Sequence, residues 1–570
     1  KGIHAFFNCL EKNAYKIQYR VMLSRYRGKT KCKSCSGSRL RADADYVKIN
    51  NKSISEINRM AISDATLFFK TLKLNSEDQK IAKRIIDEIN SRLSYLKDVG
   101  LGYLTMERAS NTLSGGESQR INLATSIGSS LVGSMYILDE PSIGLHPRDS
   151  LRLIEVLKKL RDVGNSVIVV EHDEEMMKSA DMIIDIGPYA GRHGGEVVFK
   201  GNHSELVKAS KSLTAKYLTG QYKIEVPKVR RKPKDFIIIE QAYLHNLQNI
   251  TVKIPLNQIC VVTGVSGSGK STLIGKILHT FLERFFLTGL VKASHCNDIK
   301  MNFDLVSGVE YINQNPIGKS SRSNPITYTK GYDDIRQLFA SEKHAKAKGF
   351  KPGYFSFNVD GGRCEKCQGE GQLTISMQFM ADVHLKCDEC DGKRFKEEVL
   401  EVKFKGKNIS QVLEMTVEES LDFFSEDNTL CKKIKAKIFA LSEVGLEYVQ
   451  LGQASNTLSG GEAQRIKLAS FLSHNKSKQK KLFIFDEPTT GLHFHDVKKL
   501  IKALQDLVEM GHHVVIIEHH MDIIKSADWI VDLGPEGGDK GGTLVFEGSP
   551  ESFVKSKVLS PTKDHLKEYI

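Results

Sequence analysis

The residues with the clearest chemical potential form a glycine-rich run, G-V-S-G-S-G-K-S-T. Its glycines let the backbone turn tightly, so that consecutive N–H groups can face a phosphate. The lysine can reach the β- and γ-phosphates, and the serine after it can bind Mg²⁺. An apolar run precedes the loop and a helical pattern follows it, which is the context such a loop requires. We therefore expect ATP to be bound by Gly264, Val265, Ser266, Gly267, Ser268, Gly269, Lys270, Ser271 and Thr272.

Two adjacent acids, Asp486 and Glu487, end another apolar run. Side chains at the carboxyl end of a strand emerge into the crevice where an α/β sheet binds its ligands. Asp486 is expected to hold Mg²⁺ through water, and Glu487 to polarise the attacking water as general base. His519 follows the next strand and could contact the γ-phosphate. Such acids can also simply be solvated, but the glycine-rich run in the same half favours catalysis.

Six of the ten cysteines occur in C-x-x-C pairs. Two of these pairs supply four soft ligands on two knuckles, a pattern typical of tetrahedral Zn²⁺. The residues of this predicted site are Cys364, Cys367, Cys387 and Cys390. Cys32 and Cys35 match the second knuckle only and are interpreted as half of a site. Because no export signal is evident, bound metal fits better than disulfides, and we expect a cytoplasmic protein; reduced, metal-free thiols are the alternative.

The segments that must position these residues occur in an internal sequence repeat of two copies. The stretch from Leu113 to Gly201 recurs from Leu458 to Gly548, about 345 residues later. L-S-G-G-E-S-Q-R returns as L-S-G-G-E-A-Q-R, and L-D-E-P-S-I-G-L-H returns as F-D-E-P-T-T-G-L-H. The glycine-rich run occurs only once. Two such blocks with one phosphate-binding loop predict two ATPase heads, the first without its front end.

The repeat also sets the expected domains. Residues 1–222 are predicted to be the C-terminal part of a first head, with the half zinc knuckle but no phosphate-binding loop. A basic stretch with two prolines, 223–234, is predicted to be an exposed linker. Residues 235–570 are predicted to be a complete second head with a zinc-binding insertion at about 315–440. Alternating strands and helices predict an α/β fold with a buried, largely parallel sheet in each half.

The bulk composition is that of a globular chain. Its 570 residues are 40% hydrophobic and 26% charged, and no window of 18 consecutive apolar residues occurs, so no membrane span is expected. The formal charge of +13 favours polyanionic partners but does not choose among nucleic acid, nucleotide and acidic protein.

The L-S-G-G-E blocks resemble the signature of the ABC ATPase superfamily, in which the signature of one head closes over ATP held by the other. For an isolated block, helix N-capping alone would be the favoured interpretation. The resemblance implies that the site of Lys270 is completed by Ser114, Gly115, Gly116 and Glu117. It also implies that Asp139, Glu140 and His172 belong to a second, incomplete site together with 459–462.

The spacing narrows the family further. A phosphate-binding loop and a signature about 190 residues apart, separated by a four-cysteine module, resemble the UvrA family of bacterial nucleotide-excision repair. Strings at 314–328, 353–358 and 528–539 match as well, and the likeness covers essentially the whole chain as the C-terminal portion of a UvrA. The family's usual arginine-threonine-proline is replaced here by lysine-serine-serine at 319–321.

The resemblance implies an ATPase with Mg²⁺ and Zn²⁺ that binds damaged duplex DNA, forms a homodimer and loads UvrB, while other subunits cut the strand. It implies a coupling role for Gln314 and DNA contact by Lys319 and Arg322. The alternatives are a UvrA-like paralogue outside repair, for example in drug tolerance, and a twin-cassette ABC ATPase of transport or translation. A purely structural zinc-stapled DNA clamp is a further alternative. Transport and translation cassettes lack the cysteine-bearing insertion.

Overall fold

The computed structural model describes residues 2–26, 30, 32–113, 115–128, 132–209, 211–289, 292–318, 320, 322–375, 383–473 and 479–570. The chain divides into two compact units. One comprises Lys1–Lys97 and Leu104–Leu113, and the other comprises Asp98–Tyr103 and Ser114–Ile570. The predicted first head is divided between the two units and the predicted second head lies in the second unit, so the boundaries at residues 222 and 235 stay a prediction.

The first unit is built mainly of helices. Its elements are α1 (Ile3–Lys12), α2 (Ile17–Tyr26), the hairpin β1 (Lys48–Ile49) and β2 (Lys52–Ser53), α3 (Ile54–Arg59), α4 (Ile62–Lys70) and α5 (Ser76–Asp98). Ser53 caps α3 and Glu56 closes the capping box, which satisfies free N–H groups at the start of this short helix. Cys32 is exposed and Cys35 half-buried, and both are free thiols.

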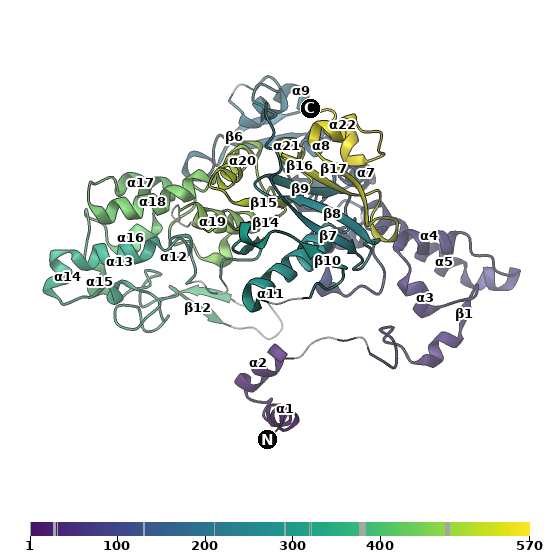
Figure 1. Cartoon of the computed structure of the whole chain (residues 1–570), viewed down its shortest axis with the longest axis horizontal. Coiled ribbons are helices and arrows are strands. Elements are labelled where there is room, and N and C mark those ends of the chain that lie inside the picture. The colour runs from purple at the N-terminus through teal and green to yellow at the C-terminus, as the bar shows by residue number, and fades with distance from the viewer. Residues whose placement is uncertain are drawn as a thin grey trace. The chain divides into compact units, whose positions relative to one another are not determined.

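A six-stranded sheet forms the centre of the second unit (Figure 1). Its strands lie in the order β11 (Val309–Ile312), β14 (Leu482–Asp486), β15 (His513–Ile517), β9 (Ile259–Gly264), β16 (Trp529–Gly534) and β17 (Thr543–Gly548). Neighbouring strands are parallel, except for the antiparallel pair β16–β17. Every residue of β9 is buried, because its continuous apolar run is covered on both faces. Its end therefore fixes the glycine-rich run rigidly.

Further elements surround this sheet. A three-stranded antiparallel sheet has the order β10 (Asp298–Lys300), β7 (Phe236–Ala242) and β8 (Ile250–Pro255). The segment after the glycine-rich run is a π-helix, Thr272–His279, which continues as α11 (Thr280–Thr288) rather than the single α-helix expected from the pattern. The remaining helices here are α19 (Gly460–Leu472), α20 (Phe494–Glu509), α21 (Met521–Ser526), α22 (Pro550–Lys555) and α23 (Pro561–Leu566).

The first repeat has less sheet than expected. In its described residues, β3 (Met135–Asp139) and β4 (Ser166–Val170) form one parallel pair, and β5 (Ile183–Gly187) and β6 (Glu196–Gly201) form a separate antiparallel pair. Residues along β3 and β4 alternate between exposed and half-buried, so the predicted buried sheet is found only in the second half. The helices of this repeat are α6 (Gly115–Gly128), α7 (Pro147–Asp162), α8 (Glu174–Ser179), α9 (His203–Leu206) and α10 (Leu213–Leu218).

The insertion between the glycine-rich run and the second signature is mostly helical. It contains α12 (Pro325–Tyr328), α13 (Gly331–Ser341), α14 (Lys343–Ala347), β12 (Gln372–Ile375), β13 (Val383–Lys386), α15 (Glu397–Leu400), α16 (Ile409–Glu414), α17 (Val417–Phe423) and α18 (Thr429–Glu443). Tyr332 and Phe357 are buried and stack with ring centroids 4.9 Å apart, so these rings pack a core. Within the described part of the chain, no helix is both long and apolar enough to cross a membrane.

The predicted linker, 223–234, forms no helix or strand. It is not free, however, because Arg230 donates hydrogen bonds to Glu551 and to the carbonyls of Lys525 and Ala527. The side chain of Arg230 is only 12% exposed. The prediction of an exposed linker is therefore wrong at this arginine, which fastens the segment to the second repeat.

Candidate active site

The glycine-rich run turns sharply at the end of β9. Gly264 has a φ of +129°, and a Cβ added there would lie 1.9 Å from the carbonyl oxygen of Leu533, so only glycine fits. Lys270 is buried, and its Nζ donates to the carbonyl oxygens of Gly264 and Val265, both at 2.9 Å. The hydroxyl of Ser268 is buried without a hydrogen-bond partner among the described residues. A tight turn with an unsatisfied hydroxyl and an enclosed cation fits a phosphate ligand.

The charge of Lys270 is balanced by acids from both repeats. Burial lowers the pKa of Lys270 to about 8, against the opposing effect of nearby carboxylates. These carboxylates belong to Glu487, Asp532, Asp149 and Asp486. Asp149 comes from the first repeat, so the electrostatic environment of this lysine is already shared between the two repeats.

The two acids expected at the end of β14 lie in this environment. The hydroxyl of Tyr311 donates to Asp486 Oδ2 at 2.8 Å. Burial, with the neighbouring carboxylates of Asp486 and Glu518, raises the pKa of Glu487 to about 7. A carboxylate that titrates near neutrality is suited to general-base chemistry at physiological pH.

His519 lies next to Glu487. Its Nε2 is 3.9 Å from Glu487 Oε1, and its ring is 6% exposed. Burial, and then the charge of Lys270, hold the pKa of His519 well below its usual range, so the imidazole is neutral. Its Nδ1 is buried without a hydrogen-bond partner among the described residues. A neutral ring with an unsatisfied nitrogen can accept or donate a hydrogen bond to a ligand at this position.

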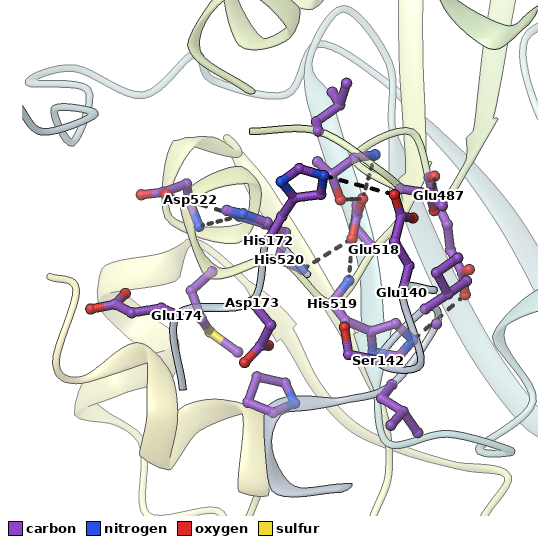
Figure 2. Close-up of a pocket in the computed structure, with 18 of the residues that line it drawn as sticks. Glu140, Ser142, His172, Asp173, Glu174, Glu487, Glu518, His519, His520 and Asp522 are labelled. Carbon is purple, nitrogen blue, oxygen red and sulfur yellow. Dashed lines mark hydrogen bonds and ion pairs between the residues drawn. The ribbon is translucent and has the colours of Figure 1, made fainter. Parts of the chain in front are cut away.

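The loop after β3 crosses onto this site from the first repeat. The Ser266 hydroxyl donates to the carbonyl of Gly144 at 3.2 Å. Gly144 has a φ of +66°, and a Cβ there would lie 3.0 Å from Glu487 Oε2. The mirror contact exists as well, since a Cβ at Gly491 would lie 3.0 Å from Glu140 Oε1. Glu140 and Glu487 line one cavity of about 180 Å³ between the repeats (Figure 2).

The first signature reaches the glycine-rich run indirectly. Ser114 lies outside the described residues, Gly115 begins α6, and Gly116 packs so closely that a Cβ would lie 2.6 Å from the carbonyl of Ile143. Glu117 is buried and accepts a hydrogen bond of 2.7 Å from the hydroxyl of Tyr103. The ring of Tyr103 lies against Gly267, where a Cβ would be 2.6 Å from Tyr103 Cδ2. Tyr103 thus joins signature and loop.

Gln314 occupies a different position from the other predicted residues. Its Nε2 donates to the hydroxyl of Thr490 at 3.0 Å, and that hydroxyl donates to the carbonyl of Glu487, also at 3.0 Å. These two hydrogen bonds connect Gln314 to the backbone of Glu487 through Thr490.

Two of the three counterpart residues of the first repeat, Asp139 and His172, are more exposed than those of the second. His172 Nε2 lies 3.8 Å from Glu140 Oε1, as the dashed line in Figure 2 shows. The His172 side chain is 38% exposed, against 7% for His519. Asp139 is exposed, and burial raises the pKa of Glu140. At the second site the histidine and the aspartate are thus more exposed, whereas the side chains of Glu140 and Glu487 are similarly exposed, at 24% and 27%.

The four predicted zinc ligands meet in one cluster. Their Sγ atoms all lie within 4.8 Å of one another, and all four side chains are buried. The Sγ–Sγ distances are 3.9 Å between Cys364 and Cys387 and 3.6 Å between Cys367 and Cys390. Thiolates bound tetrahedrally to Zn²⁺ at about 2.3 Å are separated by roughly 3.8 Å. The donor set and the spacing fit zinc, whereas Cys32 and Cys35 belong to no such cluster among the described residues.

The residues expected to contact DNA are only partly described. Lys319 lies outside the described residues. Arg322 is 28% exposed and lies 3.6 Å from Oε1 of Glu370, which lies between the two cysteine pairs. Its Nε is buried without a hydrogen-bond partner in the described part of the chain. DNA contact by either residue stays a prediction.

Several residues of this site were not predicted. Tyr311, Tyr103 and Glu518 carry no motif of their own. Glu518 accepts from the backbone N–H groups of Thr489, His519 and His520. The one available signal was repetition, because Glu171 and Tyr448 occupy the corresponding positions of the other copy.

Comparison with known proteins gives consistent matches. The chain is 52% identical over 555 residues to UvrABC system protein A of Clostridium perfringens, and 51% identical over 552 residues to that of Staphylococcus aureus. These alignments cover 96% and 97% of the chain but 58% of each relative, so the chain spans somewhat more than half their length. The crystal structure of UvrA2 from Deinococcus radiodurans matches with a TM-score of 0.85 and 38% identity, over 94% of this chain and 66% of that one. No protein-family model matches.

Proposed function

We propose that this chain, which is similar to UvrABC system protein A over nearly all of its residues, is part of an ATP-dependent DNA-damage recognition subunit. Its fold is the α/β fold of tandem ABC-type heads, as in UvrA2. The observation that carries the proposal is the shared site, in which Gly144 of the first repeat lies against both Ser266 and Glu487 of the second.

In this proposal ATP binds in the turn formed by Gly264–Thr272. Lys270 turns from the carbonyls of its own loop to the phosphates, which present a stronger acceptor for a buried ammonium group. Ser271 and Asp486 would hold Mg²⁺, which supplies charge neutralisation for the phosphates when bound. Glu487 accepts a proton from the attacking water, and His519 contacts the γ-phosphate from the same side.

The first signature completes this site. Tyr103 lies on Gly267 and donates a hydrogen bond to Glu117, which supports the proposal that Ser114, Gly115, Gly116 and Glu117 complete the γ-phosphate site. Gln314 lies behind Glu487 through Thr490 and is proposed to transmit the nucleotide state to the insertion that follows it. We propose that the four-cysteine cluster binds structural Zn²⁺.

Distorted duplex DNA, a UvrB-type partner and a second copy of the chain are the proposed partners. A formal charge of +13 supports contact with phosphates, and we place Lys319 and Arg322 among the contacting residues. The strand incision is assigned to other subunits. A UvrA-like role outside repair is the second candidate, because of the UvrA2 match, but the identity to proteins named UvrABC system protein A is higher, at 51–52% against 38%.

The test combines turnover with binding. The full chain should hydrolyse ATP, and it should bind a duplex carrying one bulky adduct more tightly than the same duplex without it at matched salt. ATP turnover with equal affinity for both duplexes would leave the ATPase in place and favour the role outside repair. The absence of turnover would contradict the shared site itself.

A further inference from the structure

Each repeat carries a Ser-x-Thr sequence at the start of its last helix, which the proposed function leaves unused. In the second repeat, Ser560 and Thr562 lie at the start of α23. The Ser560 hydroxyl donates to Asp532 Oδ2 at 2.6 Å, and the Thr562 hydroxyl donates to Asp532 Oδ1 at 3.1 Å. All three side chains are buried. Both carboxylate oxygens of Asp532 therefore accept hydrogen bonds from hydroxyls at the start of α23.

A histidine from the other repeat joins this group. His146 Nε2 lies 3.1 Å from Thr562 Oγ1, and its Nδ1 accepts from the backbone N–H of Arg148 at 3.2 Å. Because the single hydroxyl proton of Thr562 is given to Asp532, its oxygen can only accept from His146. His146 therefore carries its proton on Nε2, which leaves Nδ1 free to cap α7. Burial also holds the pKa of His146 well below its usual range, in agreement with a neutral ring.

An equivalent group exists with the repeats exchanged: the first repeat supplies the acid and the two hydroxyls, and the second supplies the histidine. Ser212 and Thr214 donate to Asp185 at 2.6 and 3.1 Å, and Thr214 Oγ1 lies 3.2 Å from Nε2 of His493 in the second repeat. His493 Nδ1 accepts from the backbone N–H of His495, as the other histidine does from Arg148. Two independent copies with matching distances indicate a built feature of the fold.

The histidine of each group ends the loop that crosses onto the opposite site. His146 follows two residues after Gly144, whose backbone meets Ser266 and Glu487. The ring of His146 also lies edge-on to that of His519, with centroids 6.0 Å apart. The Thr562 hydroxyl, at the start of α23, can thus hold the loop of Gly144 over Glu487 through His146, without contacting the nucleotide.

We propose that Thr562 is a positioning residue for ATP hydrolysis: with Asp532 it fixes His146 and thereby holds residues 143–146 of the first repeat over Glu487 of the second. Thr214 occupies the corresponding place at the opposite site, where it contacts His493 of the second repeat. This inference rests on the proposed function, and it makes the last helix of each repeat a control point for the site that the other repeat completes.

The test uses the full chain and the isosteric substitution Thr562→Val. We expect kcat to fall about tenfold or more, because a displaced loop no longer orients Glu487, while KM for ATP changes less than about twofold. Thr562→Ser keeps the hydroxyl and should restore most of the lost turnover. An unchanged kcat in Thr562→Val beside an active wild type would overturn the proposal, as would a serine variant as slow as the valine variant.

Amide hydrogen exchange tests the hydrogen bonds of this group independently of ATP turnover. Thr562→Val should speed exchange at Arg148, whose N–H depends on His146 Nδ1, and not at His495. Thr214→Val is the matched control and should speed exchange at His495 and not at Arg148. Faster exchange at both amides in either variant means general destabilisation and contradicts the proposal. An inactive wild type would instead contradict the proposed function, while the exchange result would still decide this inference.

Discussion

The two repeats end corresponding strands with the same acids and follow them with a histidine, yet the two settings differ in burial. Every residue of β15 is buried, whereas β4 alternates between exposed and half-buried residues. Ile137 of β3 is 69% exposed, while its counterpart Ile484 of β14 is fully buried. In the second repeat β14 and β15 belong to a six-stranded sheet, in which β9 lies between β15 and β16. Among the described residues, no strand lies between β4 and β5.

The electrostatics follow the same division. Where β9 closes the sheet, burial brings the pKa of Glu487 to about 7 and that of Lys270 to about 8. At the other site burial also raises the pKa of Glu140, but no lysine of a glycine-rich run accompanies it. The strand that carries the phosphate-binding loop therefore supplies the cation, and burial at the same site raises the pKa of both Asp486 and Glu487.

The largest expected effect tests this cation. Lys270→Ala should lower ATP turnover by on the order of 100-fold or more, because a preorganised charge on the phosphates is lost. Steady-state phosphate release measures it. Lys276→Ala is the matched control, since Lys276 is exposed on the segment that follows the loop. Comparable turnover in the two variants would mean that the first repeat, and not the enclosed site, carries the activity.

The next prediction separates the two sites by pH. General-base action needs ionised Glu487, so kcat/KM should rise as pH increases through about 7; it should fall again through about 8 as Lys270 loses its proton. The two values belong to an interacting pair, and only the bell shape and its position are tested. Glu487→Asp should move the acidic limb. If Glu140→Asp moved it equally, the contrast between the two sites would be lost.

The acids and the cysteine cluster could be predicted from the sequence for local reasons, whereas the exposure of β3 and β4 could not. The strand end at Asp486 was predicted, because a continuous apolar run ended by acids has few other conformations available. The cysteine spacing likewise predicted the metal cluster. By contrast, Thr562 and His146 are 416 positions apart, and a lone hydroxyl and a lone imidazole carry no pattern that connects them. The anchoring of Arg230 on Glu551 was missed for the same reason.

The cysteine pairs also differ between the two repeats, since the second repeat has a cluster of four cysteines and the first has one pair. The complete cluster should bind one zinc ion per chain, whereas Cys32 and Cys35 lack partners of this kind in the described part of the chain. Cys387→Ser should release the zinc and lower the melting temperature by several degrees, because a structural site contributes directly to folding. Cys35→Ser should change neither quantity. Metal analysis and thermal unfolding are the measurements, and zinc retained in Cys387→Ser would contradict the assigned ligand set.

The smallest expected effect is on the affinity for DNA. Arg322, in the insertion of the second repeat, is one of the residues proposed to contact it. Arg322→Ala should weaken binding to any duplex a few-fold and reduce the slope of log K against log salt by about one, as expected for one lost phosphate contact. Arg322 lies 3.6 Å from Glu370 in this structure, so that carboxylate competes with phosphate for the guanidinium. Glu370→Gln should therefore tighten binding while keeping the salt slope.

These two variants together decide the role of Arg322. A structural ion pair would make both substitutions lower the melting temperature and leave the salt slope unchanged, because neither side chain would then contact a phosphate. A phosphate contact makes their effects on affinity opposite in sign. Titrations of labelled duplex at several salt concentrations separate the two outcomes, since only a residue that displaces counterions changes the slope.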